Sequence, residues 1–498
     1  MTTNPLSLLP GTPYPASLVE MGRLALWLVA TPQGKRLAVL APFNSALVES
    51  FRGEVSEVAD GRLLLSCPLD SANAQALRFA LPNLQPVPLG LATSAGFGDR
   101  LGLATPGHVR ALEQVNGNHP GKGIAPIFAQ QSVRELARTG RSAEQVLADA
   151  TWGAFEGGWH GPVGADADHL KTPADVDRFA AAGFTFFTID PGAFVDSTAD
   201  SLSGVALEHK AGKLPWPALE SSLPDLLQRL DGKQFDLENH ELVLDREQVL
   251  RAAVKYGAAV AHVTRMYRHL EGKGIPFELE VSVDETETPT THAEHVYVAS
   301  ELQRLGVMWV SLAPRFVGRF EKGVDYIGDL DALAADLAGH AAVARALGPY
   351  KLSLHSGSDK FSVYPLARAA AGGTRGPGLH LKTAGTSLLE GLRTLAKVDP
   401  GLFRKMLTLS IERYPLERAS YHVSAELTKV PAPASLPDAA LPALLDQFDA
   451  RQVLHVTFGS LLERYGSDLC RILSEHAEEY YQALEKHFVR HLELLIGD

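Results

Sequence analysis

The sequence predicts an α/β protein: a (β/α)8 barrel of the TIM type with insertions, preceded by a small β-rich N-terminal region. The chain has 498 residues, which suits one large barrel with additions. From about residue 93 onward, short apolar runs alternate with segments of helical pattern, and a polar cluster ends most of the runs. Strands that alternate with helices form parallel sheets, and eight or more such units favour a closed barrel over an open sheet.

Residues 1–92 differ from the rest of the chain. Turn-like sequences separate three short apolar runs, at 24–30, 35–43 and 61–69. This pattern is typical of short strands joined by tight turns. We expect a β-rich accessory region here and assign no chemistry to it.

Ten apolar runs in the remaining chain are candidate strands, at 99–108, 123–132, 161–170, 184–191, 277–285, 306–316, 350–360, 379–387, 419–427 and 453–460. Ten is two more than the barrel holds, so one or two of them must be lid strands or helices. The long interval 197–271 is the best candidate for an insertion beside the mouth of the barrel. Residues 93–498 are therefore expected to form one catalytic barrel with an insertion near 197–271.

Composition narrows the function. The formal net charge of −12 argues against general nucleic-acid binding. Cys67 and Cys470 are too few for a disulfide framework or a cysteine-rich metal site, so histidines and carboxylates must hold any bound metal. The N-terminus lacks a signal-peptide pattern, and no apolar run approaches the ~20 residues of a membrane span. We expect a cytoplasmic protein with no membrane partner, and its oligomeric state is left open.

The stretch VGADADHLKT, at 163–172, places Asp166, Asp168 and His169 within four residues. One interpretation is a solvated turn in which an Asp caps the helix that begins near Thr172. In a parallel barrel, however, the carboxyl ends of all strands meet on one face, where barrel enzymes have their active sites. Other polar residues in or just after candidate strands would meet this stretch there: Asp190, Asp284, Arg315, His355, Lys360, Lys382 and His422.

Histidines in this pattern indicate a metal site. His169, His355 and His380 stand in or just after candidate strands, with His422 as a fourth. Imidazoles with a carboxylate are the usual ligands of a catalytic Zn, Mn, Fe or Ni ion. Any single histidine could equally be a hydrogen-bonded core residue.

Carboxylates recur on one face of the run 277–285. Period-two alternation places Glu278, Glu280 and Asp284 together, and buried carboxylates are costly unless they are hydrogen-bonded, bind a metal or take part in catalysis. A structural ion pair is the alternative. The sequence GFGDRLG at 96–102 has the wrong spacing for a dinucleotide fingerprint, so no NAD site is expected.

Several long motifs resemble the tagaturonate/fructuronate epimerase family: GDRLGLATPGH, FAQQSVRELARTGR, GADADHLKT, FTFFTIDP, EVSVDETETPT, VSLAPRFVGRFEKGVDYIGDL, YKLSLHSGSDKFSVYP and HLKTAGTSLLE. The resemblance runs from about residue 96 to residue 426. It implies a divalent-metal C4 epimerase that interconverts D-tagaturonate and D-fructuronate, with relatives that act on fructose and tagatose.

The chemistry of a 2-ketose suggests roles for individual residues. The hydrogen on C4 is β to the carbonyl and is not acidic, so inversion is better explained by retro-aldol cleavage of C3–C4 and re-addition. This route needs two acid/base groups and a metal. Asp168 and Glu280 are the candidate acid/base pair, with Asp284 or Glu278 as substitutes for Glu280. The candidate metal ligands are His169, His355 and His380, with His422 as a replacement for one of them.

Further residues are candidates to bind the substrate: Lys171, Asp190, Asp284, Arg315, Lys360, Lys382 and His422. The expected ligands are a divalent metal and a ketose or keto-uronate, without NAD. A metal-dependent sugar aldolase or ketose isomerase on the same barrel is the alternative enzyme. A non-catalytic sugar-binding protein is disfavoured because it would not need paired acid/base carboxylates.

Overall fold

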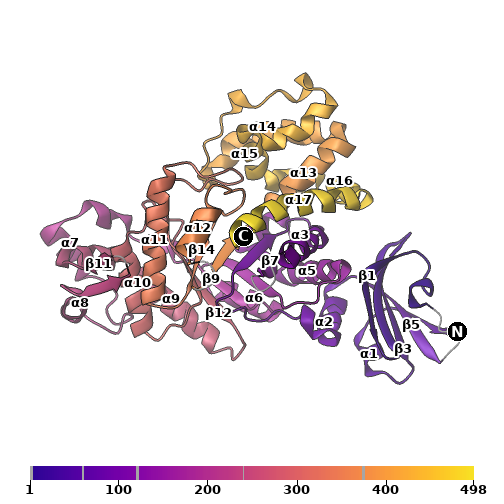
Figure 1. Cartoon of the computed structure of the whole chain (residues 1–498), viewed down its shortest axis with the longest axis horizontal. Helices are drawn as coiled ribbons and strands as arrows, with labels where there is room; N and C mark the ends of the chain where they lie inside the picture. Colours follow the sequence, from indigo (N-terminus) through magenta and orange to yellow (C-terminus); the bar gives the residue numbers. More distant parts are fainter. Residues whose placement is uncertain (1–3, 59–60, 119–122, 239, 373–375, 498) are drawn as a thin grey trace.

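Eight parallel strands close into a barrel at the centre of the computed structural model (Figure 1), which describes residues 4–58, 61–118, 123–238, 240–372 and 376–497. Helices surround the barrel, which confirms the predicted fold class. In chain order, its strands are β6 (Ser94–Gly98), β7 (Ala125–Ser132), β8 (Gly164–Leu170), β9 (Phe186–Ile189), β12 (Glu278–Ser282), β13 (Ser311–Ala313), β14 (Lys351–Leu354) and β15 (Leu379–Lys382). Strand β15 pairs with β6, and β9 with β12, so the sheet has no free edge.

The two surplus apolar runs are not strands. The expectation that one or two of the ten runs are helices or lid strands is met at 453–460, whereas 419–427 is neither. Residues 419–427 lack regular strand structure, and 453–460 span the end of α15 (Phe448–Val456) and the start of α16 (Phe458–Glu475). Helix α15 is buried along nearly its whole length, and a short buried helix has the same continuous apolar pattern as a buried strand. The first barrel strand also lies earlier than predicted, because 99–108 contains a loop and the start of α3 (Thr105–Asn118).

The N-terminal region is a five-stranded antiparallel sheet, as the β-rich prediction required. Its strands lie in the order β1 (Thr12–Met21), β2 (Leu24–Thr31), β3 (Gly34–Pro42), β5 (Arg62–Pro68) and β4 (Glu54–Val58). Alternate residues of β2 point to opposite faces: Leu26 and Leu28 join the main core, whereas Trp27 packs in a separate small cluster. Two short helices, α1 (Ala46–Ser50) and α2 (Ser71–Ala80), complete this region.

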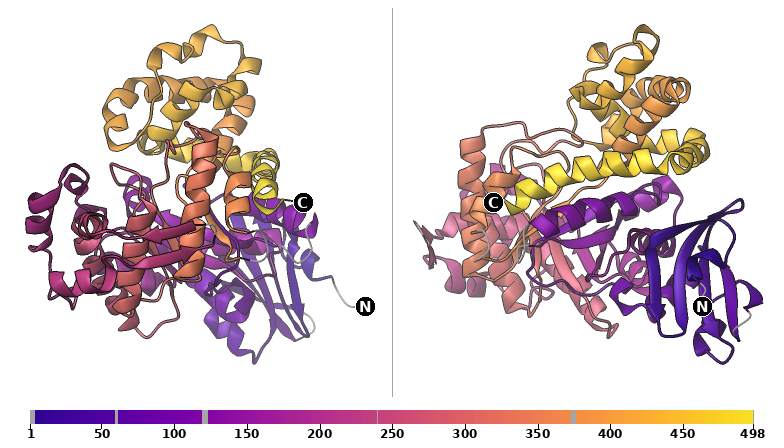
Figure 2. Two further views of the ribbon diagram at one scale, coloured as in Figure 1. Left: turned by 60° about the vertical axis from the view of Figure 1, so that its left-hand side comes forward. Right: turned by 45° about the vertical axis from the view of Figure 1, so that its right-hand side comes forward.

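Helices after the last barrel strand form a layer beside the barrel. They are α13 (Thr386–Val398), α14 (Pro400–Glu417), α15, α16 and α17 (Ala477–Ile496). Helix α17 lies along α3 (Figures 1 and 2), where Glu478 accepts two hydrogen bonds from Arg110, at 2.9 and 2.8 Å. Further along α17, the Tyr481 hydroxyl donates to Glu156, which also pairs with Lys35 of the N-terminal sheet. One helix therefore contacts both the barrel layer and the accessory sheet.

The interval 197–271 contains two short helices, a hairpin and one long helix. These are α7 (Gly204–Ala211), α8 (Leu223–Leu230), β10 (Gln234–Leu237), β11 (His240–Val243) and α9 (Arg246–Glu271). Helix α9 packs against α6 (Pro173–Ala182) and α10 (His292–Arg304), in the helical layer of the barrel. The remaining helices of that layer are α4 (Val133–Thr139), α5 (Ala143–Gly157), α11 (Leu330–Ala346) and α12 (Tyr364–Ala370).

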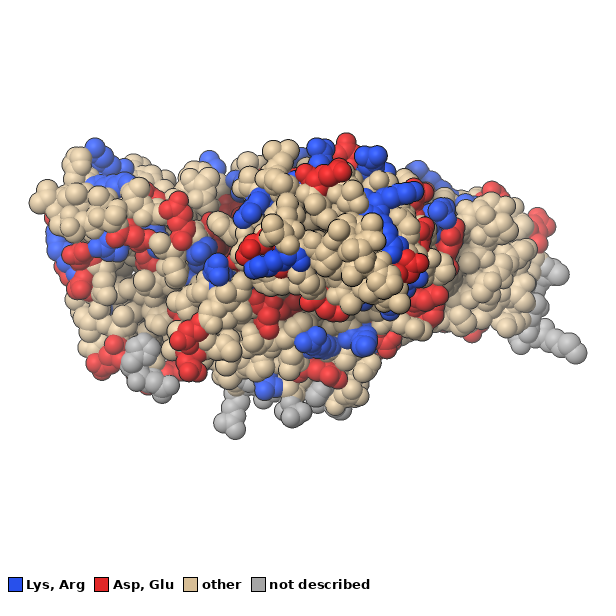
Figure 3. Space-filling view, turned by 90° about the horizontal axis from the view of Figure 1, so that it is seen from above, with Lys and Arg blue, Asp and Glu red and all other residues tan. Residues whose placement is uncertain are grey.

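Figure 3 shows acidic and basic side chains interspersed over the face seen from above. Exposed ion pairs of the protein include Lys429 with Glu426 and Arg471 with Glu475. Exposed pairs of this kind contribute little to stability individually. Within the described residues, no helix combines the length and the apolar character that a membrane span requires.

Acid should destabilise the fold through a buried histidine. His108 is fully buried, with its ring against Phe97 and Phe488. Burial lowers the pKa of His108 to about 4, against a small opposing effect of Asp99. Below about pH 6.5 the unfolded chain binds a proton here and the folded chain does not, so the free energy of unfolding falls as the pH falls toward 4.

The His108→Phe variant should therefore lose less stability than the native protein between pH 7 and pH 5, by about 2 kcal/mol. The unfolding midpoint measured at the two pH values tests this. An unchanged pH dependence in His108→Phe would contradict the assignment.

Candidate active site

Polar side chains converge at the carboxyl ends of the barrel strands. Two adjoining cavities open there. The smaller one, of about 30 Å³, is lined by residues that include Gln130, Asp168, His169, His355 and Lys382. The larger one, of about 250 Å³, shares His355 and extends along Asp284, Arg315 and His422. Residues from strands that are far apart in sequence thus meet around one space.

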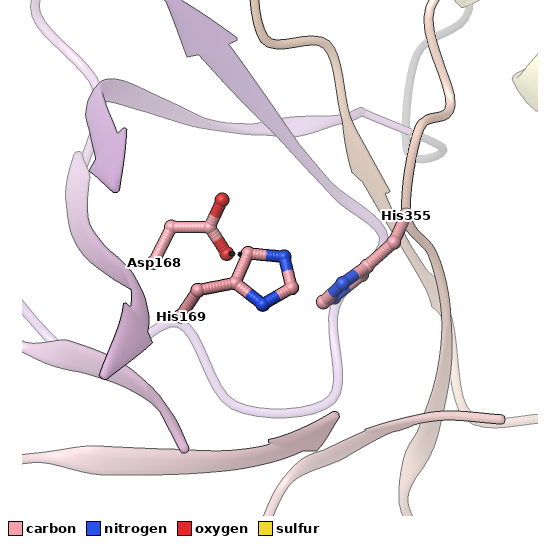
Figure 4. Close-up of side chains that lie close together, drawn as sticks. All are labelled: Asp168, His169 and His355. Atoms are coloured by element: carbon pink, nitrogen blue, oxygen red, sulfur yellow. Dashed lines mark ion pairs between the residues drawn. The ribbon is translucent and has the colours of Figure 1, made fainter. Parts of the chain in front are cut away.

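A backbone irregularity in β8 brings Asp168 and His169 to the same side. Neighbouring residues of a regular strand point to opposite faces. His169, however, has a φ of 53°, in the left-handed region, and the pairing of β8 with β9 shifts register between Ala167 and Leu170. Figure 4 shows the Asp168 carboxylate beside the His169 ring and the His355 ring on the other side of His169. Backbone conformations of this kind are strained and are concentrated at functional sites.

The alternative interpretation of this stretch, a helix cap, does not describe Asp166 or Asp168. Helix α6 is capped by Thr172, whose hydroxyl accepts from the Asp175 N–H while Asp175 accepts from the Thr172 N–H. Asp166 and Asp168 are instead buried inside the barrel mouth. Their carboxylates are available to partners from other strands.

Lys382 is the common partner of three buried carboxylates. Its Nζ lies 2.6 Å from Asp168 Oδ1, 2.9 Å from Asp166 Oδ2 and 3.0 Å from Glu280 Oε1. It also donates to the Thr188 hydroxyl at 2.6 Å. Burial opposes the ammonium charge, but the three carboxylates raise the pKa of Lys382 above its usual value. The lysine is therefore a permanent cation in this group.

The same contacts hold Asp168 and Glu280 as anions. Burial favours the protonated acids, yet Lys382 lowers the pKa of each carboxyl below its usual range, and nearby histidines add to the effect. Both groups thus carry the charge that a proton acceptor needs.

His169 and His355 lie between carboxylates. His355 has Nε2 at 2.7 Å from Glu280 Oε1 and Nδ1 at 3.1 Å from Asp284 Oδ1. Burial disfavours the charged rings, but Asp284 and Glu280 raise the pKa of His355 to about 10, and Asp168 and Asp190 raise that of His169 to about 9. Anionic surroundings that hold a proton on these rings would also favour a divalent cation in its place.

The residues present fit a metal ion. Asp168, His169 and His355 each offer one ligand atom, and these atoms lie within 4.8 Å of one another. Among the described residues, the buried Nδ1 of His169 has no hydrogen-bond partner, and Asp190 Oδ2 lies 3.5 Å from it. An overlapping set of His169, Asp190 and Glu285 has one imidazole and an exposed Glu285 that pairs with Arg134. The set with two imidazoles is the better match to a transition-metal site.

His380 lies away from this group. It is fully buried in β15, with Nδ1 2.9 Å from Ser94 Oγ and Nε2 3.9 Å from Asp166 Oδ2. The structure does not bring it together with His169 and His355 in a set of potential ligands. Its neighbours on β6 and β8 are interior barrel residues.

The other predicted site residues fall into two groups. Asp284, Arg315 and His422 line the larger cavity, whereas Asp190 lies beside the site, with Oδ2 3.5 Å from His169 Nδ1 and 3.2 Å from Lys171 Nζ. Lys360 does not face a cavity, because its buried Nζ donates to backbone carbonyls of Glu321, Val324 and Ser358. It holds loops together.

The sequence did not predict some residues of the site. Gln130 donates to Asp168 Oδ2 at 3.4 Å, and a side chain on Gly96 would collide with it, so the glycine makes room for the glutamine. Arg134 and Lys322 line both cavities. The pair Gln130 and Gln131 at the end of an apolar run was the available signal, since amides are uncommon inside a barrel strand.

Comparisons with known proteins agree with one another. The profile of the UxaE tagaturonate epimerase family matches residues 14–495. A tagaturonate/fructuronate epimerase of Thermotoga maritima is 40% identical over 492 residues, which cover 97% of each chain. Crystal structures of the fructuronate-tagaturonate epimerase UxaE from Cohnella laeviribosi superpose with a TM-score of 0.88 at 36% identity. The glycerol complex covers 97% of this chain and 96% of its own, and the native structure covers 98% and 97%.

Proposed function

Because the chain belongs to the tagaturonate epimerase family, we propose that it inverts C4 of a keto-uronate and interconverts D-tagaturonate and D-fructuronate. One observation carries the proposal. The buried carboxylates of Asp168 and Glu280 both contact the ammonium group of Lys382, next to the imidazoles of His169 and His355. This arrangement joins two potential proton-transfer groups through one ammonium group: Asp168 lines the smaller cavity, and the fully buried Glu280 contacts His355 and Lys382, which also line it.

We assign the metal ligands to His169 and His355, with Asp168 close enough to contribute an oxygen. When bound there, a divalent ion would supply a Lewis acid for the oxygens of a 2-ketose. Zn, Mn, Ni and Fe all suit imidazole and carboxylate ligands.

The two carboxylates divide the proton transfers. One accepts the proton of the C4 hydroxyl, and the electrons of the C3–C4 bond move toward the C2 carbonyl, which leaves an aldehyde and a three-carbon enediolate. The first carboxyl group then returns its proton to Lys382 while the Lys382 ammonium, which contacts both groups, protonates the second. The aldehyde turns over, C3 attacks its other face, and the second carboxyl group gives that proton to the new C4 oxygen. Asp168 and Glu280 exchange these roles in the reverse direction. Lys382 contacts both carboxylates and keeps them in place.

Cations at the larger cavity suit the carboxylate end of the substrate. Arg315 and Lys322 line it, and the Arg315 Nε is buried without a hydrogen-bond partner among the described residues. We propose Arg315 as the partner of the C6 carboxylate, through charge-assisted hydrogen bonds. Fructose and tagatose, which lack this carboxylate, would bind more weakly.

An isotopic label tests the reaction. Substrate deuterated at C4 should give an epimer that retains the deuterium after many turnovers in ordinary water, because the hydrogen stays on its carbon as an aldehyde hydrogen. Enzyme treated with a chelator is the control and should give no product. Mass spectrometry of the product measures the label.

Each alternative has its own outcome in this experiment. Loss of the label to solvent would point to a carbanion at C4. Accumulation of three-carbon fragments would identify an aldolase, and formation of an aldose an isomerase. Retention together with an extractable dinucleotide would favour hydride transfer.

A further inference from the structure

A second cluster of potential metal ligands lies outside the barrel mouth, between α10 and α11 (Figure 1). It consists of His292 at the start of α10 with Asp336 and His340 on α11. Their side chains are 29%, 12% and 0% exposed, so the cluster is buried on the barrel side and accessible at His292. None of these residues lines the two cavities described above.

The distances in this cluster are close to those of a zinc site. Asp336 Oδ1 lies 3.5 Å from His340 Nε2 and 3.7 Å from His292 Nε2. One ligand atom from each residue lies within 4.8 Å of the others. Tetrahedral zinc with bonds of about 2.0–2.1 Å separates its ligand atoms by about 3.3–3.4 Å. The two edges that involve Asp336 are within a few tenths of an ångström of this value. To bind the ion, His292 Nε2 would have to leave the Asp336 backbone carbonyl, from which it lies 3.2 Å.

A buried nitrogen without a partner points into the cluster. The Nε2 of His340 is fully buried and has no hydrogen-bond partner among the described residues. The other ring nitrogen, Nδ1, lies 2.9 Å from His295 Nδ1, and His295 Nε2 lies 2.8 Å from the Tyr350 hydroxyl. When His340 donates from Nδ1 to His295, its Nε2 lone pair faces Asp336. Metal-bound histidines usually donate their second ring N–H in this way.

We propose that His292, Asp336 and His340 bind a divalent transition metal, preferentially zinc, at a site separate from the active site. Two imidazoles and one carboxylate favour zinc over Mg²⁺ or Ca²⁺, which prefer oxygen ligands. The metal ion would enter from solvent at the exposed edge of His292. A water molecule on the same side would be its fourth ligand.

Such a metal would brace a wall of the larger cavity. Asp336 uses its other oxygen, Oδ2, to accept a hydrogen bond from the Val317 N–H at 3.0 Å. The Thr290 N–H, just before α10, donates to the Arg315 carbonyl at 2.8 Å, and the ring of Phe316 packs edge-on against His340. The segment that carries Arg315 and Phe316 is therefore tied to both helices that hold the ligands. Loss of the metal should loosen substrate binding without removing a chemical group.

Zinc stoichiometry tests the proposal. Protein stripped with a chelator, reloaded with zinc chloride and desalted should contain two zinc ions per chain by elemental analysis. His292→Ala should contain one, His169→Ala one, and the double variant none. His269→Ala, a partly exposed histidine paired with Asp177, is the matched control and should retain two. Because each single variant removes a different ion, failure of this site is distinguishable from failure of the active-site assignment.

A stability measurement guards against loss of folding. Zinc should raise the unfolding temperature of His169→Ala but not that of the double variant. A crystal of the zinc-loaded protein should show anomalous scattering between α10 and α11. Equal zinc contents in the native protein and His292→Ala would overturn the proposal and leave the cluster as part of a hydrogen-bonded chain from Tyr350 through His295 to His340.

Discussion

Asp168→Asn and Glu280→Gln should each lower kcat by about 10²- to 10⁴-fold, the usual contribution of a general acid/base group. Both substitutions keep the size of the side chain but remove the anion that accepts the proton of the C4 hydroxyl. Steady-state rates in both reaction directions measure the effect. The Glu280→Gln variant should retain its bound metal, since Glu280 lies outside the ligand group.

Glu278→Gln is the matched control for Glu280→Gln. Glu278 lies on the same strand and face, two residues earlier, but its carboxylate accepts hydrogen bonds from the backbone N–H groups of Leu89 and Gly90. Its loss should reduce stability and leave kcat nearly unchanged. Equal losses of rate at both positions would refute the special role of Glu280. Loss of metal in Asp168→Asn would assign Asp168 to the cation rather than to proton transfer.

Lys382→Met should abolish measurable turnover and destabilise the protein on the order of 3–5 kcal/mol, the usual cost of removing one partner from a buried ion pair. The methionine has a similar length and no charge, so Asp166, Asp168 and Glu280 would stand together without their cation. Repulsion should then force protons onto these carboxylates at neutral pH. Thermal unfolding and kcat measure the two effects separately.

A double variant distinguishes the effect of the Lys382 charge on stability from its effect on turnover. Lys382→Met combined with Asp166→Asn has one carboxylate fewer, so it should regain part of the lost stability while it stays inactive. Lys382→Arg keeps the charge and should lose less stability than Lys382→Met. A Lys382→Met protein with a native unfolding temperature would contradict the role of Lys382 as the cation of this group.

Most barrel strands were predictable because the residues that face the surrounding helices are buried and apolar, as Leu279 and Val281 are in β12. A continuous apolar run also predicted a strand at residues 453–460, which are helical. The helices there are just as buried, and the run is too short to reveal a helical period. Length and periodicity separate the two cases only in longer elements, such as α9 with its 26 residues.

The sequence predicted which residues lie in the candidate site better than it predicted how deep in the barrel each of them lies. Strand ends indicate which residues share the mouth, and this brought Asp168, His169 and His355 together. Period-two alternation places His380 and Lys382 on one face of β15, but two residues of a strand separate them by about 6–7 Å along the barrel axis. Only the register of β15 against β6 sets His380 beside Ser94, below the mouth. Register is a property of the closed sheet and cannot be read from one strand.

The packing of α17 on α3 determines the order in which this protein can assemble during translation. Arg110 and Glu478 are 368 positions apart, and at about 5–20 residues per second the ribosome needs about 20–70 s to make the segment between them. The last barrel strand ends at Lys382, so only for about the last 5–20 s of this time does the nascent chain hold all eight barrel strands while α3 still lacks α17. Phe488, which packs against Phe97 and His108, arrives later still. The time for which α3 lacks its packing partner is thus set by the number of residues that separate these two helices in the chain.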